Sequence, residues 1–245
     1  MKATGFEFRF RLWIGLLIYL LGFLAPWERM RPAANSHLWS WLALQLFLTN
    51  HLKGEQAFVL VGVVACAVAV LGAWLRVWGT AYLGQEVVRD GAMHASMVVA
   101  AGPYRRMRNP LYLGSWLTCA AVSILMPPTG ALFALIALAL FQWRLAGAER
   151  AFLEQRLGEA YREYVRRVPA LIPYKKALPV DRALKPRWGQ ALLNEIYPVG
   201  MAVTFAVLPW RFDVQLLVQC VLIFFGASLV VRAILPRRAE LASKS

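Results

Sequence analysis

The sequence is poor in charged residues for its size. Only 16% of the 245 residues are charged, whereas 60% are hydrophobic and the mean hydropathy is +0.52. Because a soluble domain carries about a quarter charged residues, this composition excludes an ordinary soluble fold. The chain is expected to be an integral membrane protein.

Side chains that build metal or disulfide frameworks are also scarce. Cys66, Cys119 and Cys220 are widely spaced within apolar runs and form no Cys-x-x-Cys pair. The three histidines form no His-x-x-x-His or His-x-x-Glu pair. We therefore expect small buried cysteines, no disulfide framework and no metal site.

Several functional signatures are missing. No Gly-x-Gly-x-x-Gly follows a strand pattern and no P-loop occurs, which disfavours a soluble nucleotide-binding domain. The net charge is +14, but no basic stripe with interleaved aromatics occurs outside the loops that flank apolar runs. Lys and Arg in such loops fix topology and contact anionic headgroups, so we expect membrane lipids and no nucleic acid as partners.

Long apolar runs are abundant. The run 12–25 is short for a span, follows Lys2, Arg9 and Arg11, and has no small-x-small cleavage site, so we expect an uncleaved anchor. Residues 32–52 could span the membrane or lie in its interface. Five further runs are near the ~20 residues that cross the hydrocarbon: 57–75, 111–126, 129–146, 193–209 and 214–235. The expected fold is all-α, a polytopic membrane protein with six or seven transmembrane helices.

The basic loops predict the orientation. Loop 76–110 is basic, and residues 144–190 carry eleven Lys/Arg against five acidic residues. Positively charged loops stay in the cytoplasm, so both loops and the basic C-terminus are expected there, in the inner or cell membrane if the source is bacterial. Six spans would place the basic N-terminus on the same side, which favours six over seven.

The stretch "GPYRRMRNPLYLG" at 102–114 precedes one apolar run. Asn109-Pro110 is typical of an N-cap followed by proline in the first turn. The N-terminus of this helix offers free backbone N–H groups to an anion, and three arginines strengthen the field. An ordinary positive flank is the alternative interpretation.

A second element is expected at the same membrane face. Runs 111–126 and 129–146 form a hairpin around Pro127-Pro128, and one helix is predicted to continue to about Val168 with an amphipathic pattern. That helix would lie over the cytoplasmic end of the hairpin, and Glu149 would lie near the start of the helix 111–126. Backbone amides, a carboxylate and the rings of Tyr104, Tyr112, Tyr161 and Tyr164 suit a zwitterionic adenine-bearing sulfonium, S-adenosylmethionine.

The pair "GPYRRMRNPLYLG" and "AERAFLEQRLGEAYREYVRRVPALIP" resembles membrane methyltransferases of the isoprenylcysteine carboxyl methyltransferase and phospholipid methyltransferase type. The resemblance covers roughly residues 57–174 and implies three parts: an N-terminal segment 1–56, a methyltransferase core 57–174, and a linker with a C-terminal transmembrane hairpin at 175–245.

The resemblance also implies the roles of individual residues. Glu149 would hold the amino group of the cofactor, and Tyr161, Tyr164 and Arg167 would close its pocket. Glu149, Arg108 and Arg167 are the candidate catalytic residues. The residues implied to line the cofactor are Arg108, Asn109, Pro110, Tyr112, Leu113 and Gly114.

Two positions depart from the family pattern. Asn109 stands where the family pattern has a histidine, and asparagine cannot act as a base near pH 7. Arg150 stands where the family pattern has a second glutamate. The expected activity is methyl transfer from S-adenosylmethionine to a prenylated or lipid-like amphiphilic acceptor, with phospholipid N-methylation as the alternative. A non-catalytic scaffold, or a transporter lined by Arg76, Glu149 and Arg150, remains the alternative from another class.

Overall fold

Every regular element is helical in the part of the chain that the structure describes. This computed structural model describes residues 3–24, 37–49, 52–83, 101–174, 178, 185–207 and 213–234. The predicted all-α fold is thereby confirmed for these residues. Three segments that were interpreted from the sequence lie outside the described residues. They are residues 25–36, which follow helix α2 (Arg11–Leu24), residues 84–100 of the first basic loop, and the basic C-terminus 235–245.

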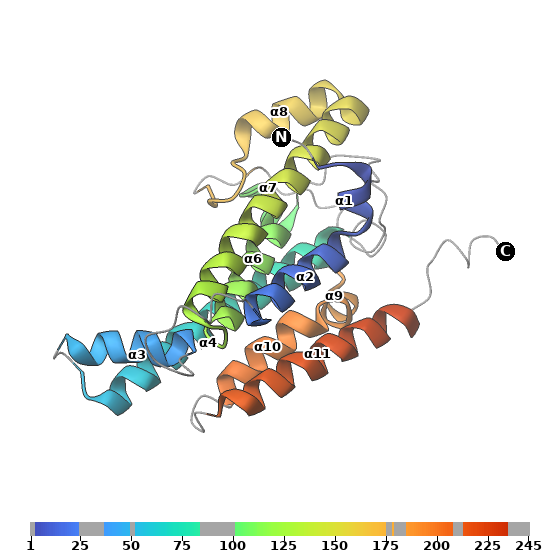
Figure 1. Ribbon diagram of the computed structural model, residues 1–245. Helices are drawn as coiled ribbons and strands as arrows, with labels where there is room; N and C mark the ends of the chain where they lie inside the picture. Colours follow the sequence, from blue (N-terminus) through green and yellow to red (C-terminus); the bar gives the residue numbers. More distant parts are fainter. Residues whose placement is uncertain are drawn as a thin grey trace.

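The apolar runs form helices close to the predicted bounds (Figure 1). Helices α6 and α7 run side by side, and α10 and α11 form a second pair. In chain order the helices are α1 (Gly5–Arg9), α2 (Arg11–Leu24), α3 (Leu38–Leu48), α4 (Gly54–Leu83), the 3-10 helix η2 (Gly102–Arg105), α6 (Pro110–Ser123), α7 (Pro128–Leu157), α8 (Glu159–Arg167), α9 (Trp188–Asn194), α10 (Ile196–Val207) and α11 (Val214–Ile234).

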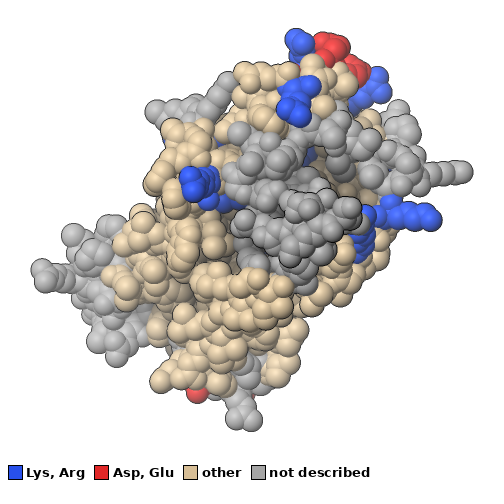
Figure 2. Space-filling model, turned by 90° about the vertical axis from the view of Figure 1, so that its right-hand side faces the viewer, with Lys and Arg blue, Asp and Glu red and all other residues tan. Residues whose placement is uncertain are grey.

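Within the described ranges, two helices, α4 and α7, are long and apolar enough to cross a membrane. Helix α7 also exposes an apolar stripe at Leu132, Ile136, Leu140 and Trp143. These residues recur every three or four positions, so they lie on one helix face, and such a face is stable in contact with lipid. Figure 2 shows Lys and Arg gathered mainly toward the upper end of the molecule, where Figure 1 places α8, above a surface with little charge. This separation of charged and apolar surface fits membrane association.

Helix α3 forms within the ambiguous segment 32–52. The amides of Leu38 and Trp39 donate to the carbonyls of Met126 (2.7 Å) and Ile124 (2.9 Å) at the turn between α6 and α7. The Trp39 indole donates to the Phe58 carbonyl oxygen of α4 at 3.0 Å. With 11 residues, α3 is about 16 Å long, about half the thickness of the hydrocarbon core.

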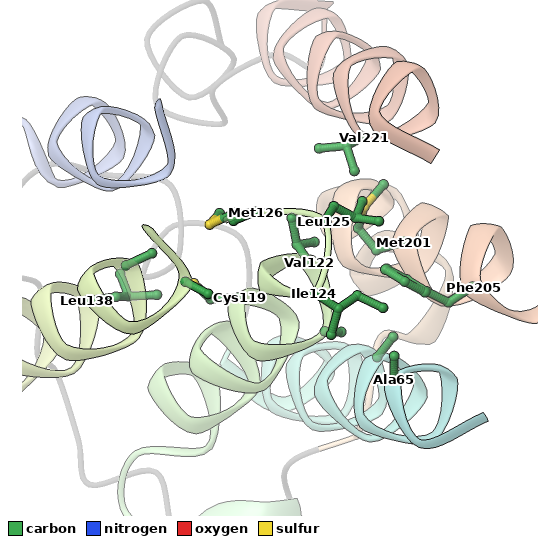
Figure 3. Packing of buried hydrophobic residues seen from close by; sticks show 14 of the residues in the cluster. Ala65, Cys119, Val122, Ile124, Leu125, Met126, Leu138, Met201, Phe205 and Val221 are labelled. Carbon is green, nitrogen blue, oxygen red and sulfur yellow. The ribbon is translucent and has the colours of Figure 1, made fainter. Parts of the chain in front are cut away.

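Helix α6 lies at the centre of the hydrophobic core. Figure 3 shows Cys119, Val122 and Leu125 between Leu138 of α7 and Met201 of α10. Cys119 is fully buried, as the sequence predicted for all three cysteines, whereas Cys66 and Cys220 are only partly buried. The core therefore joins both helix pairs through α6.

Glycines allow close contact between helix backbones at two points. A methyl group added at Gly114 would lie 2.8 Å from the Gly72 carbonyl oxygen, and one added at Gly130 would lie 1.9 Å from the Gly22 carbonyl oxygen. Carbon atoms are not tolerated at these separations. The first contact fixes α6 on α4 and the second fixes α7 on α2.

The long cytoplasmic helix predicted from the sequence is interrupted. Helix α7 ends at Leu157, and α8 begins at Glu159 after Gly158, whose φ is +56° and ψ is −130°. This backbone conformation is essentially restricted to glycine. The prediction of one continuous helix was therefore wrong, because the glycine redirects the chain so that Tyr164 of α8 reaches the Tyr104 carbonyl oxygen of η2.

The N-terminal helix α1 contacts the C-terminal half of α7. The Thr4 side chain caps α1 together with Glu7 in a capping box. Glu7 also pairs with Arg144, with Nη2 to Oε2 at 2.9 Å, and the Ala3 amide donates to the Arg144 carbonyl oxygen at 3.1 Å. The chain therefore begins at the same end of the molecule as the C-terminal half of α7.

Candidate functional site

The two sequence motifs meet through backbone hydrogen bonds. The amides of Arg108 and Asn109 donate to the carbonyls of Pro169 (2.9 Å) and Ala170 (3.0 Å). Arg108 Nε also donates to the Val168 carbonyl oxygen at 2.9 Å. The segment that follows α8 is thus held along the approach to α6, and the stretch 102–114 and the tail 168–173 form one unit.

The turn before α6 depends on local backbone geometry. Gly102 has φ +53°, and a methyl group there would lie 2.3 Å from the Tyr82 ring, so only glycine fits. Pro110 occupies the first turn of α6 and Asn109 is its N-cap residue, as predicted. The Asn109 side chain, however, makes no capping hydrogen bond. Its backbone amide instead holds the tail at Ala170.

The start of α6 and Glu149 lie together, as the sequence predicted. The Tyr112 hydroxyl donates to Glu149 Oε2 at 3.1 Å. Arg11, at the start of α2, is close enough for its charge to act on both side chains. Three helices therefore bring a carboxylate, a phenol and a guanidinium to one end of the molecule.

Three further tyrosines form a buried cluster at the same end of the molecule. Tyr104, Tyr161 and Tyr164 are all buried, and the Tyr164 hydroxyl donates to the Tyr104 carbonyl oxygen at 2.8 Å. The rings of Tyr161 and Tyr164 lie 5.9 Å apart and tilted. Burial is the main cause that raises the pKa of both phenols above the ordinary value, so both remain neutral hydrogen-bond donors near pH 7.

The Tyr104 hydroxyl is the unusual group of this cluster. It is buried and has no hydrogen-bond partner among the residues that the structure describes. Burial, followed by the charge of Glu149, raises its pKa well above the ordinary value. A buried hydroxyl without a partner costs about 1–3 kcal/mol. This hydroxyl, which would lie 3.3 Å from a methyl group added at Gly79 of α4, is therefore suited to donate to a bound ligand.

Some predicted site residues point elsewhere. Arg167 lies on the exposed face of α8 and pairs with Glu163, with Nε to Oε1 at 2.7 Å. Arg150 pairs with Glu154 at 2.7 Å. Gly114 faces α4, where an added methyl group would meet Arg76 Cγ at 2.7 Å. Arg167 thus contacts its own helix, and Gly114 serves helix packing in the observed structure. Leu113 lies in the first turn of α6 and is partly exposed.

A buried polar network was missed by the sequence analysis. Arg76 of α4 forms a two-point ion pair with Glu195, with Nε to Oε2 at 2.5 Å and Nη2 to Oε1 at 3.0 Å. Thr80 donates to Glu195 Oε1 at 2.6 Å. The sequence analysis placed Arg76 in the basic loop 76–110, whereas Arg76 lies inside α4. The sequence feature that could have indicated this pair is a single arginine next to one apolar run and a glutamate at the start of another apolar run.

No cluster of three or more potential metal ligands occurs within the described ranges. The side chains of the cluster suit a polar organic ligand. A carboxylate can bind an ammonium group, neutral phenols can donate hydrogen bonds, and aromatic rings can contact a cation or a planar base.

Comparison with known proteins identifies the central part of the chain. Residues 60–160 match the family model described as phospholipid methyltransferase. This range contains most of α4 and all of η2, α6 and α7, and therefore Tyr104, Tyr112 and Glu149. Neither the curated proteins nor the solved structures gave a match. Residues 60–160 are therefore similar to the phospholipid methyltransferase family, a family of integral membrane methyltransferases.

Proposed function

We propose that this chain transfers a methyl group from S-adenosylmethionine to an amphiphilic acceptor that reaches the site from the bilayer. The observation that carries the proposal is the Tyr112–Glu149 hydrogen bond at 3.1 Å, which joins the two halves of the family motif across α6 and α7. The family match over residues 60–160 supports methyl transfer as the reaction class.

The residues of the cluster fit the methyl donor, S-adenosylmethionine. Glu149 would bind the ammonium group of S-adenosylmethionine, and the unpartnered Tyr104 hydroxyl would donate a hydrogen bond to an acceptor oxygen of the same molecule. Tyr161 and Tyr164 would close the site, and the first turn of α6, from Asn109 to Leu113, would line it. Arg108 would act mainly by holding the tail through the Val168 carbonyl oxygen.

When bound, S-adenosylmethionine supplies an electrophilic methyl group on a sulfonium. The protein has to align the acceptor with this methyl group and exclude water, and alignment alone can supply about 7–11 kcal/mol of the barrier. A carboxylate acceptor needs no base. A protonated amine does, and Glu149 is the group that we assign to accept that proton, because Asn109 cannot.

The acceptor is proposed to be lipid-like. An isoprenylcysteine-type carboxylate is the reading favoured by the motif resemblance, and a phospholipid amine is favoured by the description of the matching family. Incubating membrane lipid extracts and prenylated peptides with methyl-labelled donor, followed by mass spectrometry, separates the two. Label in a phospholipid headgroup would favour N-methylation, and label only in the peptide would favour the carboxylate.

A six-span topology with the site in the cytoplasm is part of the proposal. Helix α2 begins near Glu149 at Arg11 and reaches the α6–α7 turn, where Gly22 packs on Gly130. Helix α3 also begins at that turn, and α4 returns to the site end with Arg76 beside Leu111. Only α2 crosses before α4 in this path, so the basic N-terminus shares a side with the basic loops.

Calorimetry on the detergent-solubilised protein tests the donor site. The wild-type chain should bind S-adenosylmethionine or its demethylated product, and Glu149→Gln should bind it much more weakly. Absence of both binding heat and thermal stabilisation in the wild type would favour the scaffold or transporter and contradict the proposed function.

A further inference from the structure

The Arg76–Glu195 ion pair links the family domain to helices outside it. Arg76 lies inside residues 60–160, whereas Glu195 lies between α9 and α10, beyond the matched range. The Glu195 side chain is 1% exposed and that of Arg76 is 17% exposed. The carboxylate receives two donors from Arg76 and a third from Thr80, so the pair is well satisfied.

The other side of the Arg76 guanidinium contacts the first turn of α6. Nη1 donates to the Ser115 hydroxyl and lies 3.4 Å from the Leu111 carbonyl oxygen. Ser115 in turn donates to the same Leu111 oxygen at 2.8 Å. Leu111 precedes Tyr112, which holds Glu149. One arginine therefore connects Glu195 to the turn that carries the proposed donor contacts.

Stability alone gives a weak reason for this arrangement. Removing two charges from water is costly, and a buried pair can often be replaced by apolar residues without loss of stability. Polar groups buried within membrane helices are accordingly associated with function. Here the pair sits where an arginine fork can fix the position of one helical turn by contacting both a carbonyl and a hydroxyl.

We propose that Arg76 and Glu195 are positioning residues for the methyl-donor site. Glu195 holds the guanidinium, and the guanidinium holds the first turn of α6 at the distance from α7 that lets Tyr112 meet Glu149. The C-terminal helices thereby support the Tyr112–Glu149 contact, whose two residues lie within the matched range 60–160. This inference rests on the proposed function.

The decisive variant is the double substitution Arg76→Met/Glu195→Leu, which removes the pair without leaving an unpaired buried charge. It should keep its thermal midpoint but bind S-adenosylmethionine about 10–100-fold more weakly, as expected when a remote change displaces a binding group. The KM for the donor should rise while the KM for the acceptor stays. Donor affinity equal to wild type would overturn the inference and leave the pair a structural one.

Ser115→Ala provides a second variant should the double variant not fold. It removes the Ser115 hydroxyl that accepts from Arg76 and leaves the Arg76–Glu195 pair intact, so a weaker donor affinity supports positioning and an unchanged one contradicts it. Glu159→Gln, which removes an exposed partner of Arg166, is the matched control and should bind the donor normally.

Hydrogen exchange separates this inference from the proposed function. In the double variant, amides at the start of α6 should exchange faster than in wild type even without donor. If these amides exchanged faster in the double variant but the wild type bound no S-adenosylmethionine, the proposed function would be refuted. The coupling between the ion pair and the start of α6 would still stand. Unchanged exchange would refute the coupling itself.

Discussion

The Tyr112 hydroxyl of α6 donates a hydrogen bond to the Glu149 carboxylate of α7 at 3.1 Å. The two residues are separated by a hairpin, yet they meet where α6 begins and where α7 continues past the apolar run. The tail after α8 then returns to pair with Arg108 and Asn109. Through these contacts the two motifs enclose one polar cluster, which gives the predictions below a common location.

Loss of the Glu149 charge should weaken donor binding selectively. A hydrogen bond to a charged group contributes about 1.5–3 kcal/mol, so Glu149→Gln should raise the dissociation constant for S-adenosylmethionine about 10–100-fold. Calorimetry measures this directly. Glu154→Gln, which removes the exposed partner of Arg150, should leave the dissociation constant unchanged; equal losses in both variants would point to a general effect of charge on this helix.

Tyr104→Phe should separate binding from stability. The Tyr104 hydroxyl is buried without a partner among the described residues, so removing it should leave the unliganded protein as stable or up to about 1–3 kcal/mol more stable. Donor affinity should fall nevertheless, because a ligand contact is lost. Thermal unfolding with and without donor checks both effects.

Tyr164→Phe is the matched control for Tyr104→Phe. The Tyr164 hydroxyl has a partner, the Tyr104 carbonyl oxygen at 2.8 Å, so its removal should lower stability by about 1 kcal/mol. If Tyr104→Phe destabilised the unliganded protein just as much, the hydroxyl would have a structural partner and its role toward the donor would be contradicted.

The parts of the site that were predictable are those encoded over short distances. Asn109-Pro110 marks the start of α6 because proline fits the first turn of a helix but not its interior. Glu149 follows from the hairpin, since two antiparallel helices joined by a tight turn bring their far ends together. Local sequence chemistry thus predicted where α6 begins and which carboxylate lies beside it.

The parts that were missed depend on distant or conformational information. Gly158 interrupts the helical pattern only through its positive φ, which a single glycine in an otherwise periodic helix does not announce. Arg76 and Glu195 are 119 positions apart, and their pairing depends on how α9 and α10 pack on α4. Arg167 matched a family motif position, yet on this chain Glu163 is within reach on the same helix and holds it outside the cluster.

Helix packing at Gly130 should tolerate no side chain. A methyl group there would lie 1.9 Å from the Gly22 carbonyl oxygen, so Gly130→Ala should destabilise the protein by about 1–3 kcal/mol as α2 and α7 move apart. Gly15→Ala, where nothing lies within 4 Å of the added carbon, should stabilise α2 by up to about 1 kcal/mol. Thermal midpoints of the two variants in the same detergent test the contrast, and a stable Gly130→Ala would contradict the close backbone contact.

The Glu7–Arg144 pair predicts how stability depends on pH at the N-terminal helix. Hydrogen bonding to Arg144 lowers the pKa of Glu7 from 4.5 to about 2. Because the folded pKa is the lower one, the contribution of the pair is fully present above about pH 4.5 and is lost as the pH falls toward 2. Glu7→Gln should therefore flatten the decline of the thermal midpoint in this window while leaving its pH dependence above 5 unchanged. A decline that persists equally in Glu7→Gln would assign the acid sensitivity to other carboxylates and show that the pair does not hold α1 on α7.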